Sequence, residues 1–133
     1  MKDQKKVTKT EQEWKEQLNP DQYHVLRQAG TERPFSGKYN DHKEKGTYVC
    51  AGCRQELFTH ENKFSTSCGW PSFHSEKEQG NIRTEQDNSL GMSRIEILCS
   101  RCDGHLGHVF NDGPMPTGLR YCVNSLSLDF EEE

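Results

Sequence analysis

Six cysteines are the residues of this chain best suited to chemistry, and their spacing divides them into two groups. Four of them form two C-x-x-C pairs, Cys50 with Cys53 and Cys99 with Cys102. A C-x-x-C turn aims two thiolates at one point, so two such turns supply the four soft ligands of a tetrahedral zinc ion. Because four thiolates leave no position for water, this spacing predicts a structural zinc site.

Two other interpretations of the pairs are two disulfides or two independent redox pairs. A redox pair of the thioredoxin type lies at the junction of a strand and a helix, and no helix is predicted after either pair. Residues 54–98 separate the pairs, a distance longer than in a simple zinc ribbon. A zinc site therefore requires a whole subdomain between its two halves.

The remaining cysteines, Cys68 and Cys122, are unpaired in the sequence and lie in richer surroundings. Cys68 is in a predicted loop, whereas Cys122 is in a predicted strand whose alternation puts Arg120 and Asn124 on the same face. A nearby guanidinium favours a thiolate, which is the form that a nucleophilic cysteine needs. The alternative is that both cysteines are small buried apolar side chains.

Two histidines follow the second C-x-x-C pair, His105 and His108. A cysteine with a histidine nearby is a general arrangement of nucleophile and acid. Alternation places His108 and Phe110 on one strand face, with His105 on the other unless the chain bends at its glycines. The histidines could instead complete the metal shell, but four cysteines already fill a tetrahedron. Asp112 could orient an imidazole or simply form a turn.

Trp70 lies two residues after Cys68, in a loop rich in glycine and proline. A tryptophan there either fills the core or walls an apolar pocket.

Two short helices are expected to precede these residues. Thr10 and Glu13 form a capping box for the first helix. The second has Asn19 as its cap, Pro20 in its first turn and Gly30 as its left-handed stop. We expect one catalytic domain over residues 1–133, with a loose segment at 1–9, a helical segment at 10–30 and a zinc-stapled β core at 31–130.

Short segments separated by glycine, proline and asparagine follow, which is typical of antiparallel β structure. Asp87–Gly91 is a predicted hairpin turn and Asn111–Gly118 a predicted loop. The fold class is therefore mainly β, with these expected strands: Gly46–Val49, Gln55–Phe58, Asn81–Glu85, Met92–Leu98, His105–Phe110 and Leu119–Phe130.

Composition limits the classes of protein that this chain can belong to. The hydrophobic fraction is 30% and the mean hydropathy is -1.04, which implies a thin core that needs support from its cysteines. No segment is apolar enough for a membrane span, and no secretory signal begins the chain, so a reducing cytoplasm is expected. The net charge of -4 gives no general attraction to nucleic acid.

Four stretches of the chain, together with both cysteine pairs, resemble the zinc-bearing branch of the methionine-R-sulfoxide reductase family. The resemblance extends from about Gln12 to Phe130, and its motifs are TERPFSG at 31–37, CGWPSF at 68–73, HLGHVFNDG at 105–113 and RYCVNS at 120–125. It implies two antiparallel sheets that lean together in a β-tent. It also implies reduction of the R epimer of methionine sulfoxide, preferably within proteins, with thioredoxin as the reductant. We expect the chain to act as a monomer.

The resemblance also implies residue roles. Cys122 corresponds to the attacking thiolate and Cys68 to the resolving thiol, while His105 and His108 correspond to the pair that holds and protonates the sulfoxide oxygen. Supporting and substrate-binding roles fall to the remaining matched residues: Asp112, Arg120 and Asn124 for the catalytic geometry, and Trp70 and Phe110 for the substrate.

A non-enzymatic alternative is a four-cysteine zinc-binding module that binds a protein partner. It would explain the two C-x-x-C pairs but would leave Cys68, Cys122, Trp70 and the two histidines as coincidences. Thiol reactivity distinguishes the two classes, since only an enzyme needs one fast thiol that forms a disulfide when substrate is added.

Overall fold

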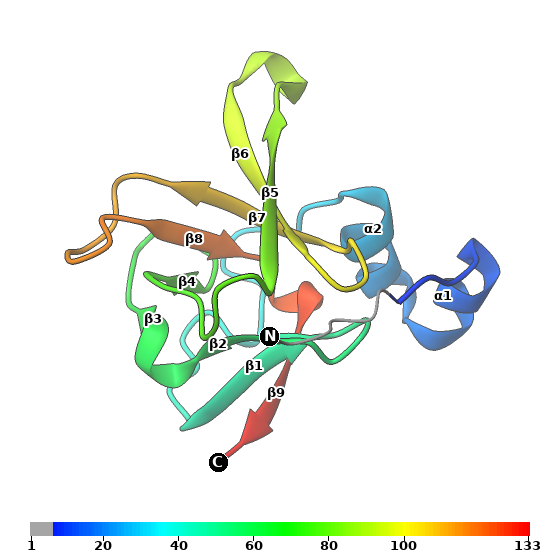
Figure 1. Ribbon diagram of the computed structural model, residues 1–133, viewed down its shortest axis with the longest axis horizontal. Coiled ribbons are helices and arrows are strands. Elements are labelled where there is room, and N and C mark those ends of the chain that lie inside the picture. Colours follow the sequence, from blue (N-terminus) through cyan, green and yellow to red (C-terminus); the bar gives the residue numbers. More distant parts are fainter. Residues whose placement is uncertain (1–6) are drawn as a thin grey trace.

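A computed structural model describes residues 7–133 as two antiparallel sheets with two short helices beside them (Figure 1). The smaller sheet has three strands in the order β2-β1-β9, and the larger has six in the order β3-β4-β8-β7-β6-β5. The prediction of a mainly β fold with two antiparallel sheets is confirmed. The strands are β1 Gly46–Cys50, β2 Glu56–Thr59, β3 Lys63–Phe64, β4 Ser72–Phe73, β5 Ile82–Asp87, β6 Arg94–Cys99, β7 His105–Phe110, β8 Arg120–Val123 and β9 Leu128–Glu132.

The helices are α1 Glu11–Gln17 and α2 Pro20–Gln28, each begun by the predicted cap. Thr10 and Glu13 form a complete capping box, and so do Asn19 and Gln22. The predicted stop at Gly30 is wrong, because Ala29 adopts the left-handed conformation, with φ 55°. Gly30 lies against the ring of His24, where a Cβ would require that exposed side chain to move.

The long strand predicted over Leu119–Phe130 is also wrong. β8 ends at Val123, a 3-10 turn (η3) covers Ser125–Ser127, and β9 begins at Leu128 in the other sheet. The alternation of a strand stops at this turn, because the consecutive residues Val123, Asn124 and Ser125 are all buried. Ser127 is satisfied there by donating its hydroxyl to the carbonyl of His105, at 2.8 Å.

The strand predicted over His105–Phe110 is confirmed with the same limits, and the limits of the other predicted strands differ by at most two residues. The predicted turn at Asp87–Gly91 is a 3-10 turn (η2) over Ser89–Gly91, and Asp87 itself still belongs to β5. β3 and β4 were not predicted, because two residues are too few to show alternation. Residues 1–6 of the predicted loose segment lie outside the described residues, while Val7 donates its backbone N–H to the carbonyl of Arg101 at 2.7 Å.

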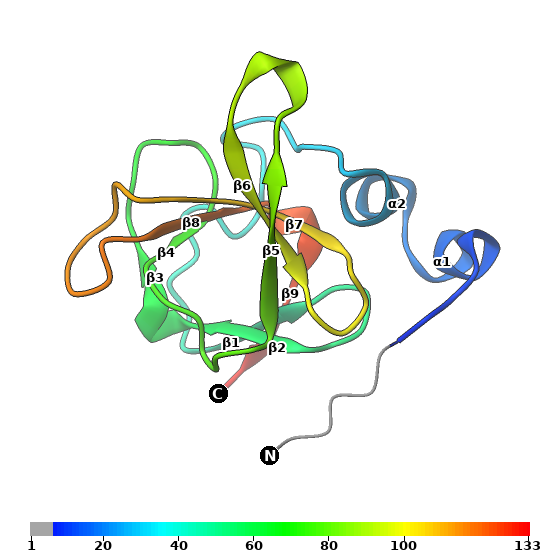
Figure 2. The ribbon, with the colours of Figure 1, turned by 45° about the horizontal axis from the view of Figure 1, so that its top comes forward.

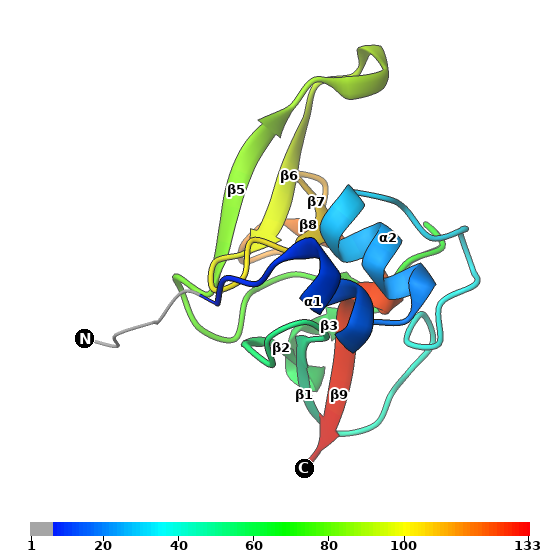
Figure 3. The ribbon, with the colours of Figure 1, turned by 90° about the vertical axis from the view of Figure 1, so that its right-hand side faces the viewer.

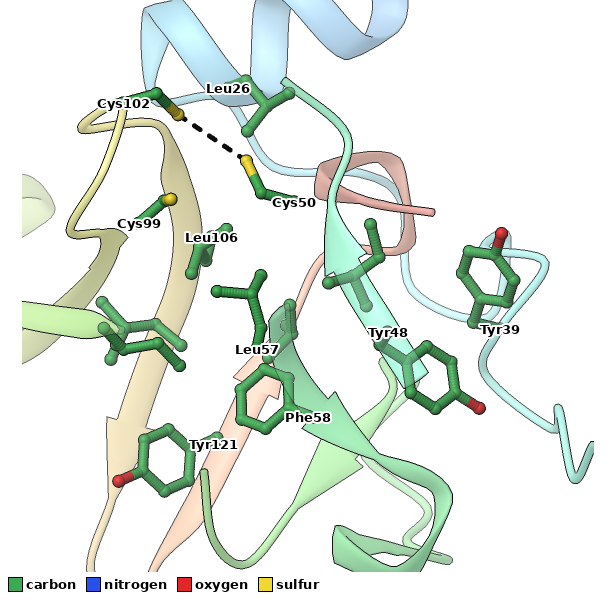
Figure 4. Close-up of a cluster of buried hydrophobic side chains, with 14 of the residues drawn as sticks. Leu26, Tyr39, Tyr48, Cys50, Leu57, Phe58, Cys99, Cys102, Leu106 and Tyr121 are labelled. Atoms are coloured by element: carbon green, nitrogen blue, oxygen red, sulfur yellow. Dashed lines mark hydrogen bonds between the residues drawn. The ribbon is translucent and has the colours of Figure 1, made fainter. Parts of the chain in front are cut away.

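The core lies between the sheets and is built largely from aromatic rings (Figure 4). Phe58 stacks on Phe73 with 4.1 Å between ring centroids, and Tyr121 meets Phe58 edge-on. Large rings bury much apolar area per residue, which offsets the low hydrophobic fraction. Cys50, Cys99 and Cys102 lie at one end of this core, beside Leu26 of α2 (Figure 4).

The helices cover the side of the molecule where the chain crosses between the sheets, next to η3 (Figure 3). The β5–β6 hairpin lies at the β5 edge of the larger sheet, and its tip points away from the smaller sheet (Figure 2). Among residues 7–133, no helix is both long enough and apolar enough to cross a membrane.

Candidate active site

Cys68 and Cys122 come together although 53 residues separate them in the sequence. Cys122 is on β8, where its register partners are Ser72 of β4 and His108 of β7. Cys68 is in the loop that leads into β4, and its Sγ lies 3.9 Å from the Sγ of Cys122. The two thiols are thus unbonded but close enough to form a disulfide after a small shift of the loop.

Cys68 is held by hydroxyl groups. Thr66 donates its hydroxyl to the Cys68 sulfur at 3.0 Å, and the Ser72 hydroxyl lies 3.4 Å from the same sulfur. The Cys68 backbone N–H in turn donates to the hydroxyl of Thr66 at 3.2 Å. These contacts fix the sulfur on the side of the loop that faces Cys122.

The environments of the two thiols separate their pKa values. Burial raises the pKa of Cys122 to about 12, and the neighbouring charge of Cys68 acts in the same direction. Burial also raises the pKa of Cys68, but the hydrogen bonds from Ser72 and Thr66 outweigh it, and the net shift is downward. In the resting pair, therefore, Cys68 is the thiol that ionises first.

Arg120 lowers the pKa of Cys122, as the sequence suggested, but less than burial raises it. The guanidinium is also shared with Asp112, to which its Nε donates at 2.9 Å, and it stacks over Phe110 at 4.5 Å from the ring centroid. Asp112 therefore contacts Arg120 rather than an imidazole. Its side chain is exposed, and it serves to hold the arginine against the pocket wall.

His105 and His108 lie on the same side of β7, with 5.6 Å between their ring centroids. An odd spacing places residues on opposite faces of a regular strand. Here the pairing of β6 with β7 shifts, because Ile97 faces Gly107 while Leu98 faces His105, which leaves Leu106 as an extra residue. This β-bulge turns His105 to the face of His108, as such bulges commonly re-aim side chains.

Each imidazole forms a hydrogen bond with a carboxylate of the β5–β6 hairpin. His108 Nε2 lies 2.8 Å from Asp87, and His105 Nδ1 lies 2.6 Å from Glu96. The hydrogen bond to His108 holds the pKa of Asp87 well below its usual range. Burial lowers the pKa of His105, although the neighbouring Glu96 carboxylate acts in the opposite direction.

These groups surround a cavity of about 240 Å³. Both cysteines, Trp70, His108 and Phe110 are among its lining residues, together with Arg120 and Asn124. His105 is buried behind His108 and Asp112 lies outside, so neither lines the cavity. The structure thus brings together seven of the nine predicted catalytic and substrate-binding residues around one pocket.

Four cysteines gather at a second place, between α2 and the ends of β1 and β6. The sulfur atoms of Cys50, Cys53, Cys99 and Cys102 all lie within 4.8 Å of one another. The pairs Cys50–Cys102 and Cys53–Cys99 are 3.6 and 3.4 Å apart. A tetrahedron with Zn–S bonds of about 2.3 Å has edges of about 3.8 Å, so this donor set fits zinc.

The two cysteine turns have the same backbone geometry. In each, the residue after the second cysteine is left-handed, with φ 69° at Arg54 and 63° at Asp103. Its N–H donates to the carbonyl of the first cysteine, Cys50 or Cys99, at 2.9 and 2.8 Å. The matching turns present their sulfur atoms from opposite sides, as two halves of one shell.

Comparison with known proteins agrees with this arrangement. Residues 18–132 match the SelR domain family. A protein from Methanosarcina barkeri named peptide methionine sulfoxide reductase MsrB is 58% identical over 130 residues, covering 98% of this chain and 92% of its own. Proteins of the same name from Leptospira interrogans and Hahella chejuensis are 54% and 59% identical, covering 96% and 94% of this chain and 97% and 90% of their own.

The chain belongs to the peptide methionine sulfoxide reductase MsrB family.

Within this MsrB chain, several residues of the site were missed by the sequence analysis. Asp87 and Glu96 reach the histidines only through the register of β5, β6 and β7, which no short motif encodes. Thr31 and Arg94 also line the pocket. Thr31 begins the TERPFSG stretch, which was the one available signal.

Glu32, the next residue of that stretch, links three parts of the MsrB site. Its backbone carbonyl accepts the indole N–H of Trp70 at 3.1 Å, and its N–H donates to the side chain of Asn124 at 3.0 Å. One carboxylate oxygen accepts the N–H of Leu126 at 2.9 Å. Asn124 also donates its amide to the carbonyl of Leu106, so it ties the bulge of β7 to the end of β8.

Proposed function

We propose that this chain reduces the R epimer of methionine sulfoxide, preferably within proteins, through a Cys122 sulfenic acid and a Cys122–Cys68 disulfide. The observation that supports it best is the 3.9 Å approach of the two sulfur atoms inside a pocket that also holds His108 and Trp70. Membership of the MsrB family supports the same reaction. The non-enzymatic binding module is set aside, because it gives no reason for this pocket.

In the first step, Cys122 attacks the sulfoxide sulfur as a thiolate while a proton is delivered to the sulfoxide oxygen. His108 is the proposed acid, since it lines the pocket and its Nε2 contacts the Asp87 carboxylate. His105, hydrogen-bonded to Glu96 and with its ring 5.6 Å from that of His108, holds the geometry beside it. Methionine leaves, and Cys122 keeps the oxygen as a sulfenic acid.

In the second step, the Cys68 thiolate attacks the sulfur of the Cys122 sulfenic acid. An S–S bond forms, and the oxygen leaves as water. The lowered pKa of Cys68 suits this role, because the resolving thiol must react as a thiolate. An external dithiol, with thioredoxin as our proposed reductant, then reduces the disulfide and restores both thiols.

The ring of Trp70 is proposed to receive the ε-methyl group in a pocket that Phe110 and Arg120 also line. Asp112 would hold Arg120, and Asn124 would hold the end of β8. With the methyl group and the oxygen both fixed, the other epimer would exchange its oxygen with its lone pair and lose the proton donor. This accounts for selectivity toward the R epimer.

We propose that Cys50, Cys53, Cys99 and Cys102 hold a structural zinc ion, which would join the two sheets and supply folding free energy. We also propose that residues 1–133 act as one catalytic domain, as a monomer and in the cytoplasm.

The test is to mix the reduced protein with racemic methionine sulfoxide and excess dithiothreitol, and to quantify each epimer by chiral separation. We expect selective loss of the R epimer. Loss of neither epimer, in folded protein whose zinc content has been verified, would refute the proposal.

A further inference from the structure

Methionine is the residue that peroxides convert to the sulfoxide, and residues 7–133 contain two methionines. Met115 is 82% exposed, whereas Met92 is 44% exposed. Oxidation of a thioether requires contact between its sulfur and the oxidant. Met115 is therefore the more open of the two to a dissolved peroxide.

Met115 lies in the loop over residues 111–118, which joins β7 to β8. The base of the loop is fixed, because Gly113 donates its N–H to the carbonyl of Gly118 at 3.0 Å and Thr117 donates its hydroxyl to the carbonyl of His74 at 2.6 Å. Met115 itself lies between two prolines, in a stretch that pairs with no strand. The loop thus presents a methionine on irregular, accessible backbone, as a peptide substrate would.

We infer that Met115 is an oxidation site of this protein and that its R-sulfoxide is a substrate for a second copy of the same chain. In the first reaction the Met115 sulfur attacks a peroxide oxygen, the O–O bond breaks, an S–O bond forms and water leaves. In the second, Cys122 of another copy takes that oxygen, and Cys68 expels it as water while the disulfide forms. This inference rests on the proposed function.

We expect repair to occur between molecules, because the loop is held in a direction that leads away from Cys122 of its own chain. The loop projects beyond the end of the larger sheet at which β8 begins, while Cys122 lies in the second half of β8 (Figure 1). The two hydrogen bonds at the base of the loop keep it in that direction.

The experiment uses Cys122→Ser protein, which cannot repair itself, as the substrate. It is treated with hydrogen peroxide, freed of peroxide, and then incubated with dithiothreitol and a trace of the wild-type protein. Peptide mapping by mass spectrometry follows the sulfoxide at Met115 and at Met92. We expect Met115 to be oxidised about twofold faster or more, and its sulfoxide to fall to about half and then stop, because peroxide forms both epimers and only one is reduced.

A short peptide that contains methionine sulfoxide is included in the same tube as a control. Reduction of this peptide without any loss of the Met115 sulfoxide would overturn the inference and leave the proposed function intact, whereas an unreduced peptide would overturn the proposed function itself. Oxidation of Met115 no faster than Met92 would also overturn the inference. Finally, the wild-type protein is oxidised and diluted before dithiothreitol is added: the rate per molecule should fall with dilution, and a constant rate would refute repair between molecules.

Discussion

The Sγ atoms of Cys68 and Cys122 lie 3.9 Å apart, on a loop and a strand that meet only because β4 pairs with β8. A disulfide requires about 2 Å between sulfur atoms, so closing the bond needs a movement of about 2 Å. Cys68 is the partner that can move, since its loop precedes a strand of only two residues, whereas Cys122 is paired on both sides.

Replacing either cysteine should separate the two steps of the reaction. We expect Cys122→Ser to abolish reduction. Cys68→Ser should release about one methionine per protein and then stall with thioredoxin, because the sulfenic acid has no internal partner. A single-turnover assay of methionine released, followed by a steady-state assay, measures both effects. Undiminished steady turnover of Cys68→Ser with thioredoxin would refute the resolving role.

The pKa order of the two thiols predicts how alkylation depends on pH. In the wild-type protein Cys68 should react with iodoacetamide at lower pH than Cys122, whose pKa is raised to about 12. In Cys68→Ser the neighbouring negative charge is gone, so the pKa of Cys122 should fall and its alkylation profile should shift toward lower pH. Mass spectrometry of each alkylated peptide gives the profiles. An unchanged Cys122 profile would show that Cys68 does not affect its ionisation.

The carboxylate partners of the histidines predict an effect on kcat. Asp87→Asn removes the charge that the Nε2 of His108 contacts, and we expect kcat to fall about 10-fold or more, with KM nearly unchanged, because general acid catalysis contributes about 10²–10⁴ to rates. Glu96→Gln is the matched control, since it alters the buried His105 that does not line the pocket, and should cost less. Asp87→Glu should restore part of the loss. A rise in KM with unchanged kcat would contradict a role in proton delivery.

The buried carboxylate of Glu32 predicts that two substitutions there change the free energy of unfolding in different ways. Glu32→Ala leaves the N–H of Leu126 without its acceptor and should lower the free energy of unfolding by about 1–3 kcal/mol. Glu32→Gln keeps an acceptor and removes a charge that burial disfavours, as the raised pKa of Glu32 indicates. A raised carboxyl pKa means that the folded state loses stability as pH rises above about 4.5. The unfolding free energy of the Glu32→Gln variant minus that of the wild type should therefore increase with pH in urea titrations, and a difference independent of pH would refute this account.

The cysteine cluster predicts that metal and fold are lost together. Cys50→Ser breaks the four-sulfur set at a fully buried position, and we expect loss of bound zinc and a fall of several kcal/mol in the free energy of unfolding, out of the ~10 kcal/mol that a structural zinc can supply. Zinc content by elemental analysis and thermal unfolding by circular dichroism measure the two quantities. A metal-free variant with unchanged stability would rule out a structural zinc.

Features that depend on local sequence were predictable from it. The capping boxes of α1 and α2 each use residues three apart, and the two C-x-x-C turns each span four residues. Such short-range patterns report directly on backbone hydrogen bonds. The identities of Cys68, Cys122, His108 and Trp70 as chemically important residues followed from their unusual local contexts, and all four line the same pocket.

Features that depend on contacts between distant parts of the chain were not predictable from the sequence. The break at Asn124 was missed although Asn124 and Ser125 interrupt the alternation between Val123 and Leu126, because no glycine or proline marks a turn there. Buried hydrogen bonds of Asn124 and Ser127 hold the chain where it crosses into the other sheet. The partners Asp87 and Glu96 depend on strand register. The raised pKa that burial imposes on Cys122 depends on neighbours from three strands, whereas the nearby Arg120 was visible in the sequence.

Because β7 is bulged, the three-residue spacing between His105 and His108 matters as much as the identity of the two residues. A strand of constant pitch would need an even number of steps between two histidines on one face, but here three steps suffice because Leu106 is accommodated as an extra residue. Gly107 allows the tight approach that follows, since a Cβ there would lie 2.0 Å from the carbonyl oxygen of Cys122. If the same sequence formed a regular strand without the bulge, one imidazole would therefore point away from the other. In related chains, the three-step spacing and the bulge must then occur together, so a histidine pair at this spacing on an unbulged strand could not act as a pair.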